Sequence, residues 1–160
     1  RRVKAQLALL VVLLTAAACS KPLTVEQQVI HTIREMEHKI ENGEQAAFLE
    51  HIDDDFTAQD GRLLRDQVRA LVMFQFNRYE RLQGQLFPIT VTETGPDTAE
   101  ARFRALVTGG PRWIPEAGQV YDFETWWELD GGDWMLKAAN WDPVPLDEVL
   151  DELPLPEYDP

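Results

Sequence analysis

Apolar and polar side chains alternate along residues 121–129, which read YDFETWWEL. A period of two predicts a β-strand with one buried face and one mostly solvated face. Residues 130–133 read DGGD, and paired glycines adopt the positive φ values that a tight hairpin turn requires. The alternation resumes at residues 134–136. Residues 121–141 therefore predict a long antiparallel hairpin, which carries four of the five tryptophans.

One residue disturbs the alternation of this hairpin. Trp141 is out of phase with Trp134 by a single position. A β-bulge at Ala138–Ala139 would return Trp141 to the face of Trp134. The alternation places Trp127 and Trp141 on the apolar face of the hairpin and Trp126 on the solvated face. We therefore expect Trp127 and Trp141 to be buried and Trp126 to be much more exposed.

The first half of the chain has helical rather than strand periodicity. Thr24 and Gln27 have the spacing of a capping box, and Asn42–Gly43 is typical of a helix end. Asp53-Asp54-Asp55 is expected to end a second helix. The apolar spacing predicts three helices, over residues 25–42, 44–52 and 66–79.

Strands are predicted after these helices and between the last two. The expected strands cover residues 56–59, 86–93 and 98–108, and then the hairpin. Pro88 indicates an edge strand or a bulge, because proline cannot donate a ladder hydrogen bond. This order predicts an α+β fold in which the apolar sheet face is covered by the helices.

Residues 1–19 have the pattern of a targeting segment. A start of two arginines and a lysine precedes an unbroken apolar run over residues 7–14. The run is too short for a permanent membrane-spanning helix. Residues 16–19 read AAAC and resemble the bacterial lipobox, in which the cysteine becomes lipidated; the alternative is an ordinary cleaved signal. The lipobox resemblance implies that Cys19 is the lipidation site, and Ser20 resembles the outer-membrane sorting class.

These observations divide the chain into four parts. We expect a signal peptide over 1–19, a tether over 20–23, a domain over 24–142, and an acidic, proline-rich tail over 143–160. The expected location is the bacterial cell envelope, lipid-anchored to the inner leaflet of the outer membrane and facing the periplasm.

The charge and the single cysteine exclude several classes of function. The 160-residue chain has a formal net charge of −13. This argues against binding nucleic acid, or anionic lipid headgroups, through a basic patch. One cysteine excludes an internal disulfide and a metal site made of several cysteines. We expect no cofactor, and contact with a membrane only through the lipid anchor.

Residues 24–142 resemble the nuclear transport factor 2-like superfamily, which includes SnoaL-like proteins and ketosteroid isomerases. The resemblance is carried by IENGEQAAFLEHIDDDFTAQDG and by the closing GGDWMLKAANW. It implies a cone-shaped, strongly bent antiparallel sheet wrapped around three N-terminal helices, often with a pocket at the open end.

The resemblance places Asp60 at the position of the proton-transferring aspartate of ketosteroid isomerases. An isomerase of that kind also needs a tyrosine and a neutral carboxylic acid to stabilise the oxyanion. Met36 and Thr125 occupy those positions here. We therefore expect a non-catalytic domain in which Asp60-Gly61 forms a turn or a polar part of the pocket. The alternative is a SnoaL-like isomerase, dehydratase or hydrolase that uses Asp60 as general base.

Several aromatic residues are candidates for a ligand pocket as well as for the core. A small apolar ligand is expected to contact Asp60 and five aromatic residues, which are Phe103, Tyr121, Phe123, Trp127 and Trp141. His31, Glu35 and His38 share a helical face, but the histidines are about 10 Å apart along the axis, so no metal site is expected.

The sequence is compatible with two further kinds of partner. An envelope protein could dock through the acidic tail after Pro143. The outer sheet face, with Trp126 beside Val120, is compatible with a homodimer.

The lipobox makes a direct prediction about residence at the membrane. Cys19→Ala should release the domain into the soluble periplasmic fraction or stall its processing, because no thiol would remain to be acylated. Fractionation and mass spectrometry of the wild type and the variant would measure this. A soluble, unacylated wild type would contradict it.

Overall fold

The computed structural model describes residues 21–79, 81–110, 117–145 and 147–149. The predicted signal peptide with Cys19 and most of the predicted tail lie outside the described residues. The helices are α2 (Val25–Glu41), α3 (Gln45–Leu49) and α4 (Arg65–Arg78). The strands are β1 (Ile52–Ala58), β2 (Leu63–Leu64), β3 (Arg81–Gly95), β4 (Thr98–Gly110), β5 (Ala117–Asp130) and β6 (Asp133–Val144).

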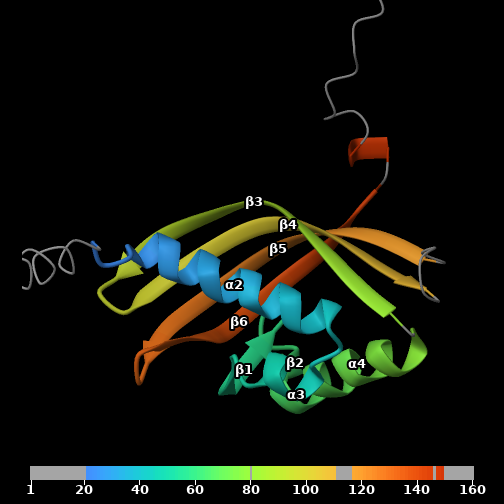
Figure 1. Cartoon of the computed structure of the whole chain (residues 1–160), viewed down its shortest axis with the longest axis horizontal. Coiled ribbons are helices and arrows are strands. Elements are labelled where there is room, and N and C mark those ends of the chain that lie inside the picture. Colours follow the sequence, from blue (N-terminus) through green and yellow to red (C-terminus); the bar gives the residue numbers. More distant parts are fainter. Residues whose placement is uncertain (1–20, 80, 111–116, 146, 150–160) are drawn as a thin grey trace, which may run out of the picture.

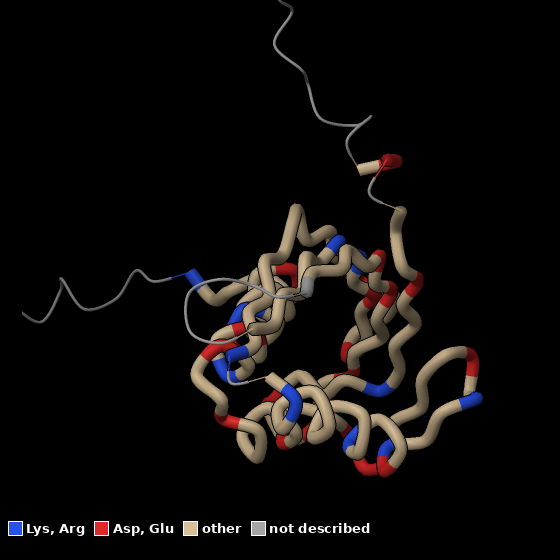
Figure 2. The backbone as a smooth tube through the Cα atoms, turned by 90° about the vertical axis from the view of Figure 1, so that its right-hand side faces the viewer, with Lys and Arg blue, Asp and Glu red and all other residues tan. Residues whose placement is uncertain are grey.

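The strands form one six-stranded, bent, open sheet in the order β2-β1-β6-β5-β4-β3. Helix α2 lies across its concave face, and α3 and α4 lie below it (Figure 1). Seen from the side, the sheet curves around an interior and the helices close the lower side (Figure 2). The α+β fold class predicted from the sequence is confirmed.

The sheet is mixed rather than wholly antiparallel. β1 runs parallel to β6, whereas every other neighbouring pair is antiparallel. Parallel pairing is available to β1 because α4 and three long strands separate it from β6, so no tight turn joins the two.

The predicted second helix is shorter than expected. α3 ends at Leu49, and the three aspartates that follow belong to β1 instead of to a helix end. Aspartate is depleted in strands, so local propensity argues against this assignment. Tertiary contacts override it: Ile52 and Phe56 are buried, and Asp53 pairs with Lys137 of β6 at 2.9 Å.

The local signals at the helix and hairpin turns are confirmed. Thr24 and Gln27 form the capping box at the start of α2, and Gly43 has a φ of 73° just after its end. Gly131 and Gly132 have φ of 60° and 99° in the β5–β6 turn. Pro88 lies in an edge strand, at a shift in register between Phe87 and Thr90.

A bulge interrupts the β5–β6 hairpin, one residue before the predicted alanines. Trp127 pairs with Leu136 and Trp126 with Ala138, which leaves Lys137 as the extra residue. Trp141 and Trp134 consequently face the same side, as predicted. The strand also continues to Val144, which is buried, so the domain extends beyond the predicted boundary at residue 142.

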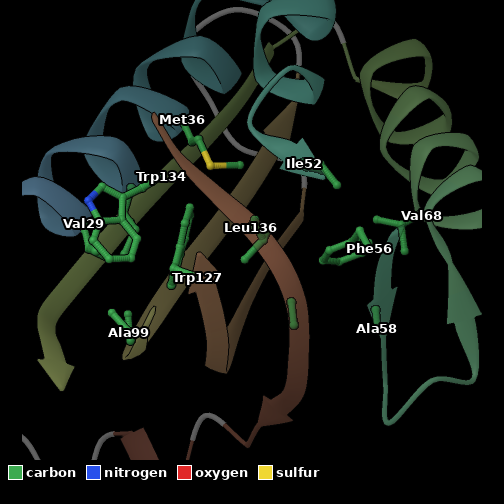
Figure 3. Close-up of a cluster of buried hydrophobic side chains, with 13 residues drawn as sticks. Val29, Met36, Ile52, Phe56, Ala58, Val68, Ala99, Trp127, Trp134 and Leu136 are labelled. Carbon is green, nitrogen blue, oxygen red and sulfur yellow. The ribbon is translucent and has the colours of Figure 1, made fainter. Parts of the chain in front are cut away.

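The core forms where α2 packs on the tryptophans of the hairpin (Figure 3). Val29, Ile33 and Met36 face Trp127 and Trp134, all of them buried. Each indole N–H has an acceptor, because Trp134 donates to Gln28 Oε1 at 3.0 Å and Trp127 to Thr125 Oγ1 at 2.9 Å. These hydrogen bonds offset the cost of burying two polar N–H groups.

Two tryptophans differ from the sequence-based expectation. Trp126 is half-buried rather than exposed, and Trp141 is half-buried rather than fully buried. Neighbouring strands shield part of a large indole even on the outer sheet face. Trp141 keeps some exposure because it borders a cavity. No helix in the described part of the chain is long and apolar enough to cross a membrane.

Trp127→Ala should cost ~3–5 kcal/mol in the free energy of unfolding, because it leaves a void in the core and removes a hydrogen bond. The matched variant Trp126→Ala should cost about 1 kcal/mol, because its indole is only half-buried. Urea unfolding followed by circular dichroism would measure both. Equal losses would contradict the packing of α2 on the hairpin.

Candidate functional site

A cavity of about 390 Å³ lies beside the core, between α4 and the concave face of the sheet. It is partly open to the outside. The helices and β1 contribute the side chains of Ile40, Phe48, Ile52, Phe56, Val68, Leu71, Val72, Gln75, Phe76 and Tyr79. The long strands contribute Leu82, Val107, Gly109, Gly118, Gln119, Tyr121, Phe123, Leu136, Ala139 and Trp141. A volume of this size falls within the range of small-molecule sites, roughly 300–1,000 Å³.

The cavity exists because α2 covers only part of the bent sheet. α4 closes the remaining part, and its inner face presents Val68, Val72 and Phe76 toward the interior. Small residues on the facing strands, such as Ala139, leave space that larger side chains would fill. Most of the lining residues are apolar, and an apolar wall gives water few hydrogen-bond partners. The site is therefore suited to an apolar molecule.

Aromatic rings form the sheet wall of the cavity. Tyr121, Phe123 and Trp141 line it, with Phe123 at 6.2 Å from each of the other two ring centroids. Phe103 does not line the cavity but stacks on Phe123 at 5.2 Å. Trp127 lies in the core instead. The structure thus places Tyr121, Phe123 and Trp141 at the cavity, as predicted. Phe103 and Trp127 lie outside its lining.

Among the residues that the structure describes, the lining contains no Asp, Glu, Lys, Arg, His or Cys. Its polar side chains are those of Gln75, Tyr79, Gln119 and Tyr121. Gln119 is held in place, since its Nε2 donates to the carbonyls of Val120 and Val144 at 2.8 and 3.2 Å. The site can therefore offer hydrogen bonds to a neutral ligand, but its described lining residues include no carboxylate or imidazole for proton transfer.

Asp60 lies away from this cavity. It occupies an exposed turn after β1 with φ of 57°, and the cavity lining does not include it. Its N–H donates to Asn140 Oδ1 at 3.0 Å, and Asn140 Nδ2 donates back to Asp60 Oδ1 at 2.7 Å. This reciprocal pair ties the turn to β6, which is a structural role.

The other two positions of the ketosteroid isomerase resemblance lie in the core. Met36 is buried on α2, and Thr125 is buried on β5. The Thr125 hydroxyl donates to Ala101 O at 2.9 Å and accepts the hydrogen bond of Trp127. The three positions named by that resemblance do not converge on the cavity.

The histidines are not placed to bind a metal. No group of three His, Cys, Asp or Glu in the described ranges has the arrangement of a metal site. His31 and His38 are exposed, and Glu35 pairs with Lys39 at 2.7 Å. Lys39 Nζ also lies 2.7 Å from His51 Nε2. Burial, and then the charge of Lys39, lowers the pKa of His51, so the neutral imidazole accepts this hydrogen bond.

Sequence reasoning missed the helical half of the site. Residues 71–76 show a helical stripe, but pattern alone does not distinguish a cavity wall from core. No pattern in the sequence identified Tyr79 as a residue of the site either. In the structure its ring lies directly against Gly109, where a Cβ would be 2.6 Å from Tyr79 Cγ.

Solved structures share this architecture, whereas no family model and no curated protein sequence matches the chain. A nuclear transport factor 2-like protein of unknown function from Pseudomonas putida has a TM-score of 0.62 and 16% identity, over 84% of this chain and 96% of that one. The chain has a nuclear transport factor 2-like fold.

Two further structures with this likeness extend the comparison. A candidate dehydratase of the nuclear transport factor 2-like family from Streptomyces avermitilis has a TM-score of 0.61 and 18% identity, over 73% of this chain and 94% of that one. Bd1075 from Bdellovibrio bacteriovorus has a TM-score of 0.65 and 11% identity, over 74% of this chain but only 40% of its own. At these identities the likeness establishes the nuclear transport factor 2-like fold alone.

The contact between Tyr79 and Gly109 predicts a specific sensitivity. Gly109→Ala should cost about 1–3 kcal/mol of stability, because the new methyl group must displace the Tyr79 ring at the end of α4. Gly84→Ala is the matched control, since no atom lies within 4 Å of its added Cβ. Thermal unfolding would measure both. Equal melting temperatures for the two variants would contradict the contact.

Proposed function

We propose that this domain binds a small, uncharged and largely apolar molecule in its cavity and does not catalyse a reaction. The observation that supports this is the lining: twenty described residues border the space, and none of them is Asp, Glu, Lys, Arg or His. A charged ligand would lose its hydration without gaining a counter-charge. An apolar ligand gains about 0.8 kcal/mol for each methylene group buried.

The four uncharged polar groups set the orientation of such a ligand. The phenols of Tyr79 and Tyr121 and the amide of Gln75 line the cavity, while the amide N–H groups of Gln119 are already engaged. A hydroxyl or carbonyl group on the ligand would find a partner among them. Pockets with this composition commonly use a few polar groups for orientation and apolar contact for affinity.

The enzyme alternative receives little support from the arrangement. Some proteins with this fold are named as candidate dehydratases, and an activity of that kind requires a group that transfers a proton. Asp60 is paired with Asn140 outside the cavity lining. We therefore favour ligand binding over catalysis.

The cellular setting is a separate part of the proposal. The apolar run at 7–14 and the AAAC sequence that ends at Cys19 support a lipid-anchored protein facing the periplasm. In that setting the domain would carry or sense an apolar molecule of the envelope. Docking of an envelope protein through the tail stays a prediction.

Binding can be tested with a fluorescent apolar probe displaced by straight-chain alcohols of increasing length. Affinity for the alcohols should rise about fourfold per methylene until the cavity is full. Leu71→Glu should weaken probe binding about tenfold or more, because it brings a carboxylate to the lining.

Phe74→Glu is the matched control for Leu71→Glu. Phe74 is an exposed apolar residue one turn further along α4, but it does not line the cavity. Probe binding should be unchanged in this variant. If the two variants bound equally, or if chain length had no effect on affinity, ligand binding in the cavity would be refuted.

A further inference from the structure

A side-chain contact ties the end of α2 to the start of β1. Lys39 Nζ lies 2.7 Å from His51 Nε2, and the same ammonium donates to Glu35 Oε1 at 2.7 Å. A lysine ammonium donates hydrogen bonds but accepts none, so this contact requires an unprotonated Nε2 on His51. A proton on that nitrogen would set two donors and two positive charges against each other. The contact can therefore exist only while the imidazole is neutral.

Lys39 has little room to avoid a second positive charge. Its side chain is only 17% exposed, and Glu35 holds it along α2. His51 is half-buried, where the chain leaves α3 and enters β1 (Figure 1). Partial burial reduces the screening by water, so two cations repel each other more strongly here than on an open surface. Protonation of His51 would be relieved by separating the two segments.

The other charged groups near His51 do not remove this conflict. Burial, and then the charge of Lys39, lowers the pKa of His51. Glu35 on α2, Asp133 at the start of β6 and the neighbouring Glu50 act in the opposite direction, but the net result is still a lowered pKa. The imidazole is therefore neutral at about pH 7 and gains its proton in acidic solution.

The two residues in contact are direct neighbours of the cavity lining. Ile40 follows Lys39 in the chain and lines the cavity. Ile52 follows His51 and lines it as well. The carbonyl of His51 also accepts a hydrogen bond from the N–H of Leu136 at 2.8 Å, and Leu136 is a further lining residue. Separating α2 from β1 would move Ile40 and Ile52 apart and reduce their contact with a bound apolar molecule.

We propose that the Lys39–His51 contact makes ligand binding in the cavity pH-dependent, so that the ligand is held while His51 is neutral and released when His51 is protonated. This regulation rests on the ligand-binding function proposed above. Affinity is highest above the ordinary histidine pKa of about 6.5 and decreases as the pH falls through the lowered pKa of His51. By linkage, a bound ligand also makes His51 harder to protonate.

The first test measures affinity for the fluorescent apolar probe at about pH 7.5 and at about pH 5. Most carboxylates stay ionised over this range, so histidine is the side chain that changes its charge. Wild-type affinity should be about tenfold lower at the acidic pH, a typical size for coupling between two sites. Circular dichroism should show an intact fold at both pH values. Equal affinities, or unfolding at the lower pH, would overturn the proposal.

Histidine variants locate the effect. His51→Gln should bind the probe almost equally at both pH values, because a glutamine amide oxygen accepts a hydrogen bond from Lys39 at either pH. The matched control combines His31→Gln with His38→Gln, which removes two exposed histidines and should keep the wild-type response. A pH response that persists in His51→Gln, or that disappears in the control, would contradict the role of His51.

The control variant also allows a measurement that leaves His51 unchanged. The chain has three histidines, so His51 is then the only one, and NMR can follow its titration directly. Saturation with a straight-chain alcohol should lower the pKa of His51 further, because protonation and binding oppose each other. An unchanged or raised pKa would refute the regulation, even if His51→Gln failed to fold.

The regulation and the ligand-binding function fail in different ways. If the wild type does not bind the probe at the higher pH, the cavity function is refuted, and the regulation that rests on it is refuted too. Binding at the higher pH with the same affinity at the lower pH refutes the regulation alone.

Discussion

The structure depends on the packing of α2 against the tryptophans of the β5–β6 hairpin. Val29, Ile33 and Met36 meet Trp127 and Trp134 on the concave face of the sheet. Burying an aromatic ring of this size removes a large apolar area from water, which is the dominant favourable term in folding. The indole N–H groups are satisfied at the same time, by Gln28 and Thr125. The packing places α2 on the concave side of the sheet (Figure 1).

The cavity follows from that packing. A bent sheet is wider than one helix, so α2 covers only one part and a second element must close the rest. α4 does this with a few apolar residues on its inner face, while its outer face keeps exposed apolar groups. Tyr79 ends α4 against the backbone of Gly109, where a side chain on the strand would not fit. The same helix therefore forms one wall of the cavity.

In the described part of the chain, the Asp, Glu, Lys, Arg and His side chains lie outside the cavity lining. Asp60 is paired with Asn140, Asp53 with Lys137, and Glu35 with Lys39. His51 lies against Lys39 and has a lowered pKa because of burial and this positive charge. Each of these pairs supports a turn, a bulge or a helix end. The separation of charge from the apolar space favours binding of a neutral molecule over proton-transfer chemistry.

Local signals in the sequence determined the elements whose conformation depends on near neighbours. The capping box at Thr24, the stop at Gly43, the Gly131-Gly132 turn and the edge position of Pro88 are all set by backbone geometry within a few residues. Alternation over residues 121–141 also identified the hairpin, its bulge and the aromatic wall formed by Tyr121, Phe123 and Trp141.

Tertiary structure alone decided the rest. Asp53 to Asp55 became part of a strand because β6 offers a parallel edge and Lys137 a partner, which no local pattern reveals. Asp60 was separated from the cavity, and α4 was brought to it, by contacts between residues far apart in the chain. A helical stripe predicts that a face is buried, but it does not predict whether that face meets another side chain or an empty space. That difference depends on the curvature of the whole sheet, and it is the reason why the site could be only half predicted from the sequence.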